Sequence, residues 1–113
     1  MAKVIFSSNL EDEINKKFGG ESVEVFELLY SLEENPNKGK FLANAGGLVI
    51  KELRYKSFRF YFITEGFKLK CFDEKELTDL LIKFVRMSDK KNQQKTIEEI
   101  KHILRTIGSR GFE

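Results

Sequence analysis

The segment from Gly47 to Tyr61 most constrains how this chain can fold, because it contains two apolar, strand-like runs joined at Lys56-Ser57. Both runs are rich in β-branched and aromatic residues, and their hydrophobic period is close to two. This pattern predicts a β-hairpin made of Leu48–Tyr55 and Phe58–Thr64.

Basic side chains recur along this predicted hairpin. Lys51, Arg54 and Arg59 carry ammonium and guanidinium groups, while Leu48 and Ile50 can point toward a core. The planar fork of an arginine matches the oxygens of a phosphate group. The pattern therefore predicts a sheet with a cationic face, and the alternative is a set of ordinary, solvated strand charges.

Composition sets the outer limits of the fold. The 113 residues are long enough for one domain, 1–113, with a core that disulfides or metals need not support. Cys71 is the only cysteine, so no internal disulfide can form. No apolar run approaches the roughly 18 residues of a membrane span, and the first residues lack the apolar centre of a signal peptide. We therefore expect a cytoplasmic protein with no membrane partner.

Charge is unevenly distributed, although the net charge is only +2. Residues 1–37 contain three Lys and eight Asp or Glu, whereas residues 38–70 contain eight Lys or Arg and two Glu. Residues 83–113 are basic again, with eight Lys or Arg and four acidic residues. Two basic segments and an acidic N-terminal third predict a surface that suits a polyanion.

The N-terminal third predicts a strand followed by a helical hairpin. Lys3–Phe6 is the predicted strand, and Ser8–Glu11 has the spacing of a capping box at the start of a helix. Gly19-Gly20 should end this helix, because glycine adopts positive φ without strain. A second helix should follow and stop at Pro36.

The C-terminal half predicts further strands and a last helix. Phe67–Phe72 alternates apolar residues with Lys, and the apolar run Leu77–Val85 is a predicted buried strand, with a helix as the alternative. Ser88–Gln94 is a predicted loop, and Thr96 should open a final helix that Gly108 closes. The predicted class is α+β: an N-terminal strand and helical hairpin packed on a three- to five-stranded antiparallel sheet, with a C-terminal helix.

Three short motifs follow one another: Leu-Val-Ile-Lys-Glu-Leu-Arg at 48–54, Phe-Arg-Phe-Tyr at 58–61, and Phe-Val-Arg-Met-Ser-Asp-Lys-Lys at 84–91. In this order and spacing the chain resembles the RelE/ParE superfamily of toxins, especially its HigB-like and phage Gp49-like branches. The resemblance implies a RelE-like fold and a toxin of a type II toxin–antitoxin system, neutralised by a cognate antitoxin protein. It also implies an mRNA endonuclease, ribosome-dependent or free, that uses no metal and no other cofactor, and we expect it to act on ribosome-bound message.

The same resemblance implies site residues. Arg59 takes the place of a transition-state arginine, Lys90 that of a second catalytic cation, and Lys51 or Glu52 that of the proton acceptor, with Arg54 beside them. In this reaction a 2′-hydroxyl attacks the adjacent phosphate, which requires a proton acceptor and cations next to the phosphorane. The basic residues expected to bind RNA are Lys56, Arg86, Lys91 and Lys95.

Three features leave other functions open. Thr96 stands where active relatives carry Tyr or His, and residues 67–76 are an insertion relative to compact relatives. Arg59 could also form only a structural ion pair with Glu52. The alternatives are a ParE-like toxin that inhibits DNA gyrase without nuclease activity, and a non-catalytic RNA- or protein-binding protein of the same fold.

Overall fold

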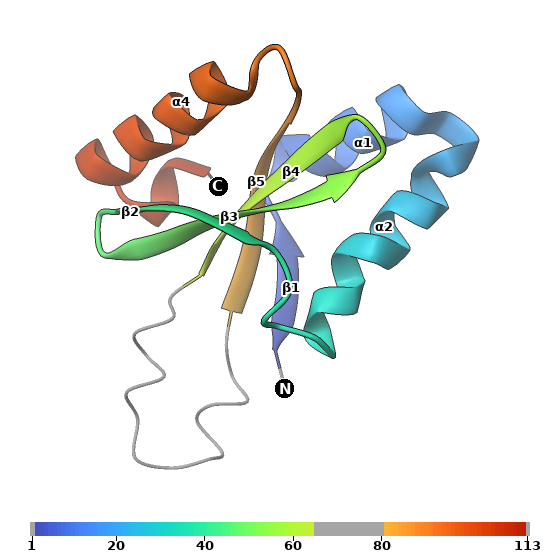
Figure 1. The fold of residues 1–113 in the computed structure, drawn as a ribbon, viewed down its shortest axis with the longest axis horizontal. Coiled ribbons are helices and arrows are strands. Elements are labelled where there is room, and N and C mark those ends of the chain that lie inside the picture. The colour runs from blue at the N-terminus through green and yellow to red at the C-terminus, as the bar shows by residue number, and fades with distance from the viewer. Residues whose placement is uncertain (1, 65–80, 113) are drawn as a thin grey trace.

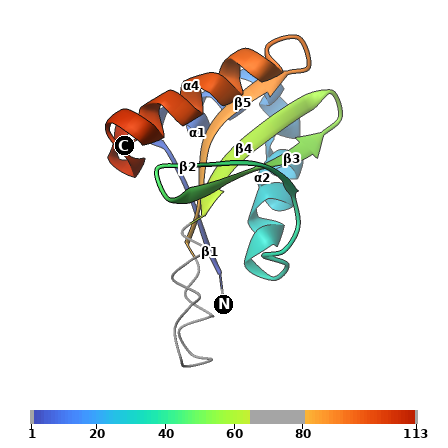
Figure 2. The ribbon, with the colours of Figure 1, turned by 60° about the vertical axis from the view of Figure 1, so that its left-hand side comes forward.

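A computed structural model of the protein describes residues 2–64 and 81–112, which form a five-stranded sheet with helices on both faces. Figure 1 and Figure 2 show helices α1 and α2 on one side of the sheet and α4 on the other. In sheet order the strands are β1 (Lys3–Phe6), β5 (Leu81–Asp89), β4 (Phe58–Thr64), β3 (Leu48–Tyr55) and β2 (Lys40–Ala45). The helices are α1 (Ser8–Phe18), α2 (Ser22–Tyr30) and α4 (Gln93–Thr106), with 3₁₀ turns at Gly19–Glu21, Ser31–Glu33 and Ser109–Phe112. None of the helices in these residues is long and apolar enough to cross a membrane.

The predicted α+β class is confirmed, with its N-terminal strand, two following helices, sheet and last helix. The sheet is mixed rather than wholly antiparallel, because β1 pairs in parallel with β5. The other neighbouring strands are antiparallel. A parallel pair needs a long crossover connection, and α1, α2 and three strands lie between β1 and β5 along the chain.

An aromatic core lies between the sheet and the helices α1 and α2. Phe60 and Phe62 of β4 and Phe84 of β5 are fully buried in this core. Helices α1 and α2 each add a pair of buried apolar residues: Leu10 and Ile14, and Val25 and Leu29. Residues four apart lie on the same face of a helix, so each helix buries one apolar face against the aromatic rings.

A second core lies under α4 on the opposite face of the sheet. Ile97, Ile100 and Leu104 are the buried residues of this helix, and their spacing of three and four places them on one side. They pack in one cluster with Ile50 of β3 and Ile63 of β4. The sheet is thus covered on both faces, and its strands alternate between two apolar environments.

The predicted hairpin of β3 and β4 is confirmed, and Leu48 and Ile50 point to a core as expected. A second hairpin joins β2 to β3 through Gly46-Gly47, where φ is 57° and 79°. Positive φ at both turn residues suits a two-residue hairpin, and glycine adopts it at little cost. The β3–β4 turn differs, because Lys56 takes a φ of 54° without being glycine.

The capping box predicted at Ser8–Glu11 is wrong. Ser7 is the residue that precedes the first turn of α1, and its side chain makes no capping hydrogen bond. Instead the Ser7 N–H donates to the carbonyl of Phe84 at 2.9 Å, and its hydroxyl donates to the carbonyl of Val85 at 3.4 Å. The serine is therefore used to join the start of α1 to β5 rather than to cap the helix.

The loop predicted at Ser88–Gln94 is also wrong at both ends. Strand β5 continues to Asp89, and α4 begins at Gln93 rather than at Thr96. Ser88 is polar but buried, because the hydroxyl of Tyr61 lies 2.8 Å from its hydroxyl across the strand pair. A tertiary hydrogen bond thus keeps a polar residue in a buried strand, which local polarity does not reveal.

The remaining sequence predictions fall partly outside the described residues. For Leu77–Val85, the strand interpretation is confirmed at residues 81–85, and residues 77–80 lie outside. The predicted strand Phe67–Phe72, and the insertion at 67–76, lie outside the described residues entirely.

Candidate functional site

Two rows of polar side chains cross the sheet on the face that α4 covers. The cross-strand register aligns Glu52, Tyr61 and Arg86 in one row. The neighbouring row aligns Arg54, Arg59 and Ser88. Directly opposed residues of antiparallel strands share a face, so six polar side chains meet at one end of a sheet whose other end is apolar.

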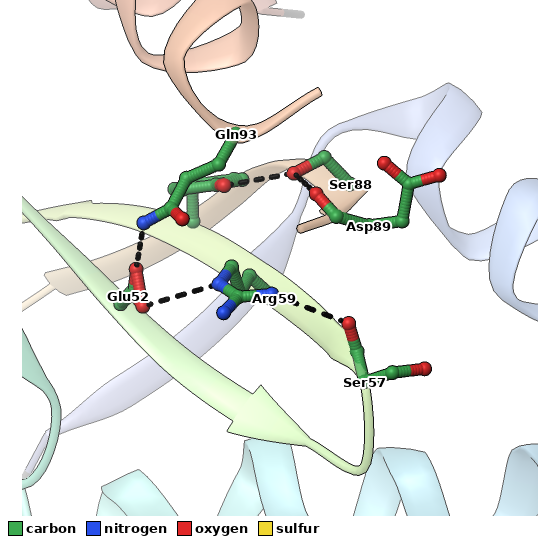
Figure 3. Close-up of polar contacts among 7 residues, drawn as sticks. Glu52, Ser57, Arg59, Ser88, Asp89 and Gln93 are labelled. Atoms are coloured by element: carbon green, nitrogen blue, oxygen red, sulfur yellow. Dashed lines mark hydrogen bonds and ion pairs between the residues drawn. The ribbon is translucent and has the colours of Figure 1, made fainter. Parts of the chain in front are cut away.

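Glu52, Arg59 and Gln93 form the centre of this polar cluster (Figure 3). The Arg59 Nε lies 3.9 Å from the Glu52 Oε2, and both side chains are almost fully buried, with 6% and 4% exposed. From the first turn of α4, the Gln93 Nε2 donates to the Glu52 Oε1 at 3.1 Å. The carboxylate of Glu52 is thus held between a strand and a helix.

Arg59 satisfies its donors only in part. Its Nη1 donates to the carbonyl of Ser57 at 3.3 Å. Its Nε is buried and has no hydrogen-bond partner within the described part of the chain. Arg54 lies directly opposite on β3, and like charges at opposed positions destabilise a strand pair. Among residues 2–64 and 81–112, the diagonal carboxylate of Glu52 is the one acidic group that pairs with Arg59, so this part of the site is rich in positive charge.

Tyr61 and Ser88 extend the cluster toward β5. Their hydroxyl groups lie 2.8 Å apart, and the Ser88 hydroxyl also donates to the carbonyl of Asp89 at 3.0 Å. Burial raises the pKa of Tyr61 above its ordinary value. The phenol therefore stays neutral at physiological pH and serves as a hydrogen-bonding group.

Arg86 is engaged with α4 and the C-terminal 3₁₀ turn. Its Nε donates to the Glu99 Oε1 at 2.7 Å, and its Nη1 donates to the carbonyl of Val85 at 2.8 Å. The guanidinium carbon lies 5.0 Å from the ring centroid of Phe112. These contacts hold Arg86 in a structural role, although it is one of the residues predicted to bind RNA.

The exposed cations of the site are Arg54, at the end of β3, and Lys90, Lys91 and Lys95, around the β5–α4 turn. None of the four forms an ion pair with another residue in 2–64 or 81–112. Within the described part of the chain, they are therefore the cations of the predicted set that are open to a polyanion.

Lys51 and Lys56 lie away from this cluster. Lys51 is on the opposite sheet face, where its Nζ is 5.9 Å from the ring centroid of Phe62, and partial burial lowers its pKa. Lys56, in the β3–β4 turn, pairs with Glu21 at 2.9 Å. Of the two predicted proton acceptors, Lys51 and Glu52, only Glu52 shares a face with Arg59.

Two residues with possible acid roles are also occupied. The Thr96 hydroxyl donates to the carbonyl of Asn92 at 2.9 Å, at the start of α4. The Tyr55 hydroxyl lies 2.9 Å from Glu21 and 3.1 Å from Glu24 on the α2 side, and these hydrogen bonds raise the pKa of Tyr55 to about 12. Neither group is placed to give a proton to a ligand beside Arg59.

Sequence reasoning missed Tyr61, Ser88 and Gln93 as members of the site. Tyr61 could have been found, because it follows Arg59 by two residues in the same strand and so shares its face. Ser88 and Gln93 carried no such signal, since their place depends on strand pairing and on where α4 begins. Among the described residues, no three His, Cys, Asp or Glu side chains converge as a metal site would require.

Comparison with known proteins adds no relative: no family model, no curated protein and no solved structure matches the chain. The RelE/ParE resemblance therefore stays a prediction that rests on the sequence motifs.

Proposed function

We propose that this protein is a toxin of a type II toxin–antitoxin system that cleaves ribosome-bound mRNA in the cytoplasm without a metal ion. The observation that carries the proposal is the double row of polar side chains, in which Arg54 and Arg59 stand opposite each other beside Glu52. A phosphate bound on the face of β3 and β4, beside both side chains, would relieve the repulsion between these arginines. The cognate antitoxin is expected to cover the same surface when the protein is inactive.

In the proposed reaction the 2′-oxygen of a nucleotide attacks the adjacent phosphorus and its proton passes to the carboxylate of Glu52. The 5′-oxygen leaves with a proton from Lys90, giving a 2′,3′-cyclic phosphate and a 5′-hydroxyl. Arg54 contacts the phosphate directly. Arg59, which is buried beneath the surface, adds a second positive charge, and fixed cations of this kind stabilise a phosphorane. Glu52 is 4% exposed, so its role requires the Gln93 side chain to move aside when RNA binds.

The test is inducible expression of the wild type and of Arg54→Ala, followed by mapping of new mRNA ends. Removing one preorganised charge donor should lower cleavage about 10²-fold. Arg54 is exposed, so its loss leaves the fold intact, whereas Arg59→Ala also removes a buried charge. Arg105→Ala, an exposed arginine at the far end of α4, is the matched control and should cleave like the wild type. Equal cleavage by wild type and Arg54→Ala would contradict the assignment.

A non-catalytic RNA-binding role is the second candidate, and the burial of Arg59 and Glu52 favours it. The same two residues that the nuclease reaction needs are already buried as an ion pair with each other. RNA bound by the purified protein without new mRNA ends in cells would support this candidate. Inhibition of DNA gyrase by the purified protein, with no RNA cleaved or bound, would instead support a ParE-like toxin.

A further inference from the structure

An open hollow of about 350 Å³ lies on the sheet face opposite to Glu52 and Arg59. It is lined by Glu13, Lys16 and Lys17 of α1 and by Met87 of β5. Met87 pairs with Phe60 across the strands and packs against the aromatic core. The hollow therefore belongs to the α1 side of the molecule and is separate from the polar cluster under α4.

The lining combines an apolar floor with a charged rim. The half-buried Met87 thioether and the methylene stems of the two lysines provide the floor. The Lys17 ammonium stands 5.0 Å from the ring centroid of Phe58, and Lys16 and Glu13 are exposed. A flat aromatic ring suits such a floor, because sulfur makes favourable contacts with aromatic rings. The two ammonium groups at the rim suit an anion attached to that ring.

The hollow lies near the end of β5 that leads into the β5–α4 turn, because Met87 lines it and Asp89 ends the strand. Hydrogen bonds from Asn92, together with the nearby ammonium groups of Lys17 and Lys91, lower the pKa of Asp89 below its ordinary value. Lys17 of α1 and Lys91 of the turn thus both lie close to Asp89 at the end of β5. A polyanion could pass around this end of the sheet from the hollow to Lys90 and Arg54.

We propose that the hollow binds one nucleotide of a single-stranded RNA. The base of this nucleotide lies against Met87, and the two phosphates that flank it lie on Lys16 and Lys17. The proposal rests on the proposed RNA-directed function and extends its binding surface to the second face of the sheet. The Glu13 carboxylate accepts hydrogen bonds but donates none, so it favours bases with an exocyclic amino group. Cytosine should therefore bind better than uracil.

The test measures the binding of fluorescent octamers of 2′-O-methyl cytidine or uridine, which cannot form a cyclic phosphate, by anisotropy over a range of salt concentrations. The double variant Lys16→Ala/Lys17→Ala should bind about tenfold more weakly, and its log–log salt slope should fall by about 1.4, because single strands lose about 0.7 per phosphate contact. Glu13→Gln should abolish the preference for cytidine. The control Lys3→Ala/Arg105→Ala removes the same charge from exposed positions elsewhere and should match the wild type.

Equal affinity and equal salt slopes for Lys16→Ala/Lys17→Ala and the wild type would overturn the inference and leave the proposed function standing. A wild type that binds neither octamer would also overturn it. Loss of binding in the double variant supports the hollow even if the wild type forms no new mRNA ends in cells. In that case the nuclease function fails while the nucleotide site stands.

Discussion

The two faces of the sheet use alternate residues of the same strands in different ways. On β4, Phe60 and Phe62 are buried in the aromatic core under α1 and α2. The alternate residues Arg59 and Tyr61 face α4, where they join the polar rows. One strand thus provides apolar packing on one side and a charged, hydrogen-bonded cluster on the other.

The face under α1 and α2 therefore mainly stabilises the fold, whereas the face under α4 also holds the polar side chains of the candidate site. The aromatic face is apolar beneath two helices, so it contributes mainly through burial. The α4 face is apolar at one end, where Ile50 and Ile63 pack with the helix. At its other end it holds the buried ion pair of Glu52 and Arg59, whose desolvation opposes its attraction. Substitutions on the two faces should therefore change the free energy of unfolding for different reasons.

Phe60→Ala should give the largest loss of stability, because it leaves a cavity in the aromatic core where Phe60 is fully buried. Large-to-small changes of buried phenylalanine cost about 3–5 kcal/mol. Urea denaturation gives the free energy of unfolding. Ile63→Val, a smaller deletion on the α4 face, should cost only about 1 kcal/mol. A loss for Phe60→Ala no larger than that of Ile63→Val would contradict the role of Phe60 in filling the aromatic core.

Arg59→Met should lower the free energy of unfolding by about 3 kcal/mol, because it leaves the buried carboxylate of Glu52 without its cation. Adding Glu52→Leu should recover most of this loss, since two apolar side chains can replace a buried ion pair. A double-mutant cycle measured by denaturation tests the coupling. Additive losses in the double variant would mean that the 3.9 Å pair contributes nothing to folding.

Tyr61→Phe should cost about 1 kcal/mol, the usual contribution of a single hydrogen bond. The Ser88 hydroxyl keeps its contact with the carbonyl of Asp89, so no polar group is left wholly unpaired. Tyr30→Phe is the control, because Tyr30 is 44% exposed and should give no measurable change. A loss well above that of one hydrogen bond would indicate that Tyr61 supports the whole polar cluster.

Lys56→Gln should have the smallest effect, and that effect should depend on pH. Hydrogen bonds from Lys56 and Tyr55 lower the pKa of Glu21 below its ordinary 4.5. A lowered carboxyl pKa stabilises the fold fully above the ordinary value, and this contribution disappears as the pH falls through the lowered value. The difference in free energy of unfolding between variant and wild type should thus be present at neutral pH and vanish at about pH 2, well below the usual carboxyl range.

Unfolding of both proteins should be followed across that range. Lys3→Gln is the control, because Lys3 is exposed and forms no ion pair with another described residue. A difference for Lys56→Gln that persists unchanged in acid would contradict the link to Glu21.

Local patterns were sufficient to predict the elements that depend on neighbours in the chain. Alternation and β-branched content predicted β3 and β4, and the glycines predicted the ends of α1 and α4. The same alternation already separates Lys51 from Arg54, because residues three apart in a strand point to opposite faces. Treating those two as one cationic face was an error that the sequence alone could have prevented.

The chain by itself thus determined most of the strands and helices, because backbone geometry repeats every 2 or 3.6 residues, but it did not reveal β2 or the start of α4. Only the tertiary structure decided that β1 runs parallel to β5, and that Ser88 and Gln93 reach the site. It alone decided that Arg59 is buried beside Glu52 rather than exposed. These features depend on contacts between residues far apart in the chain, and local spacing does not encode which distant segments meet.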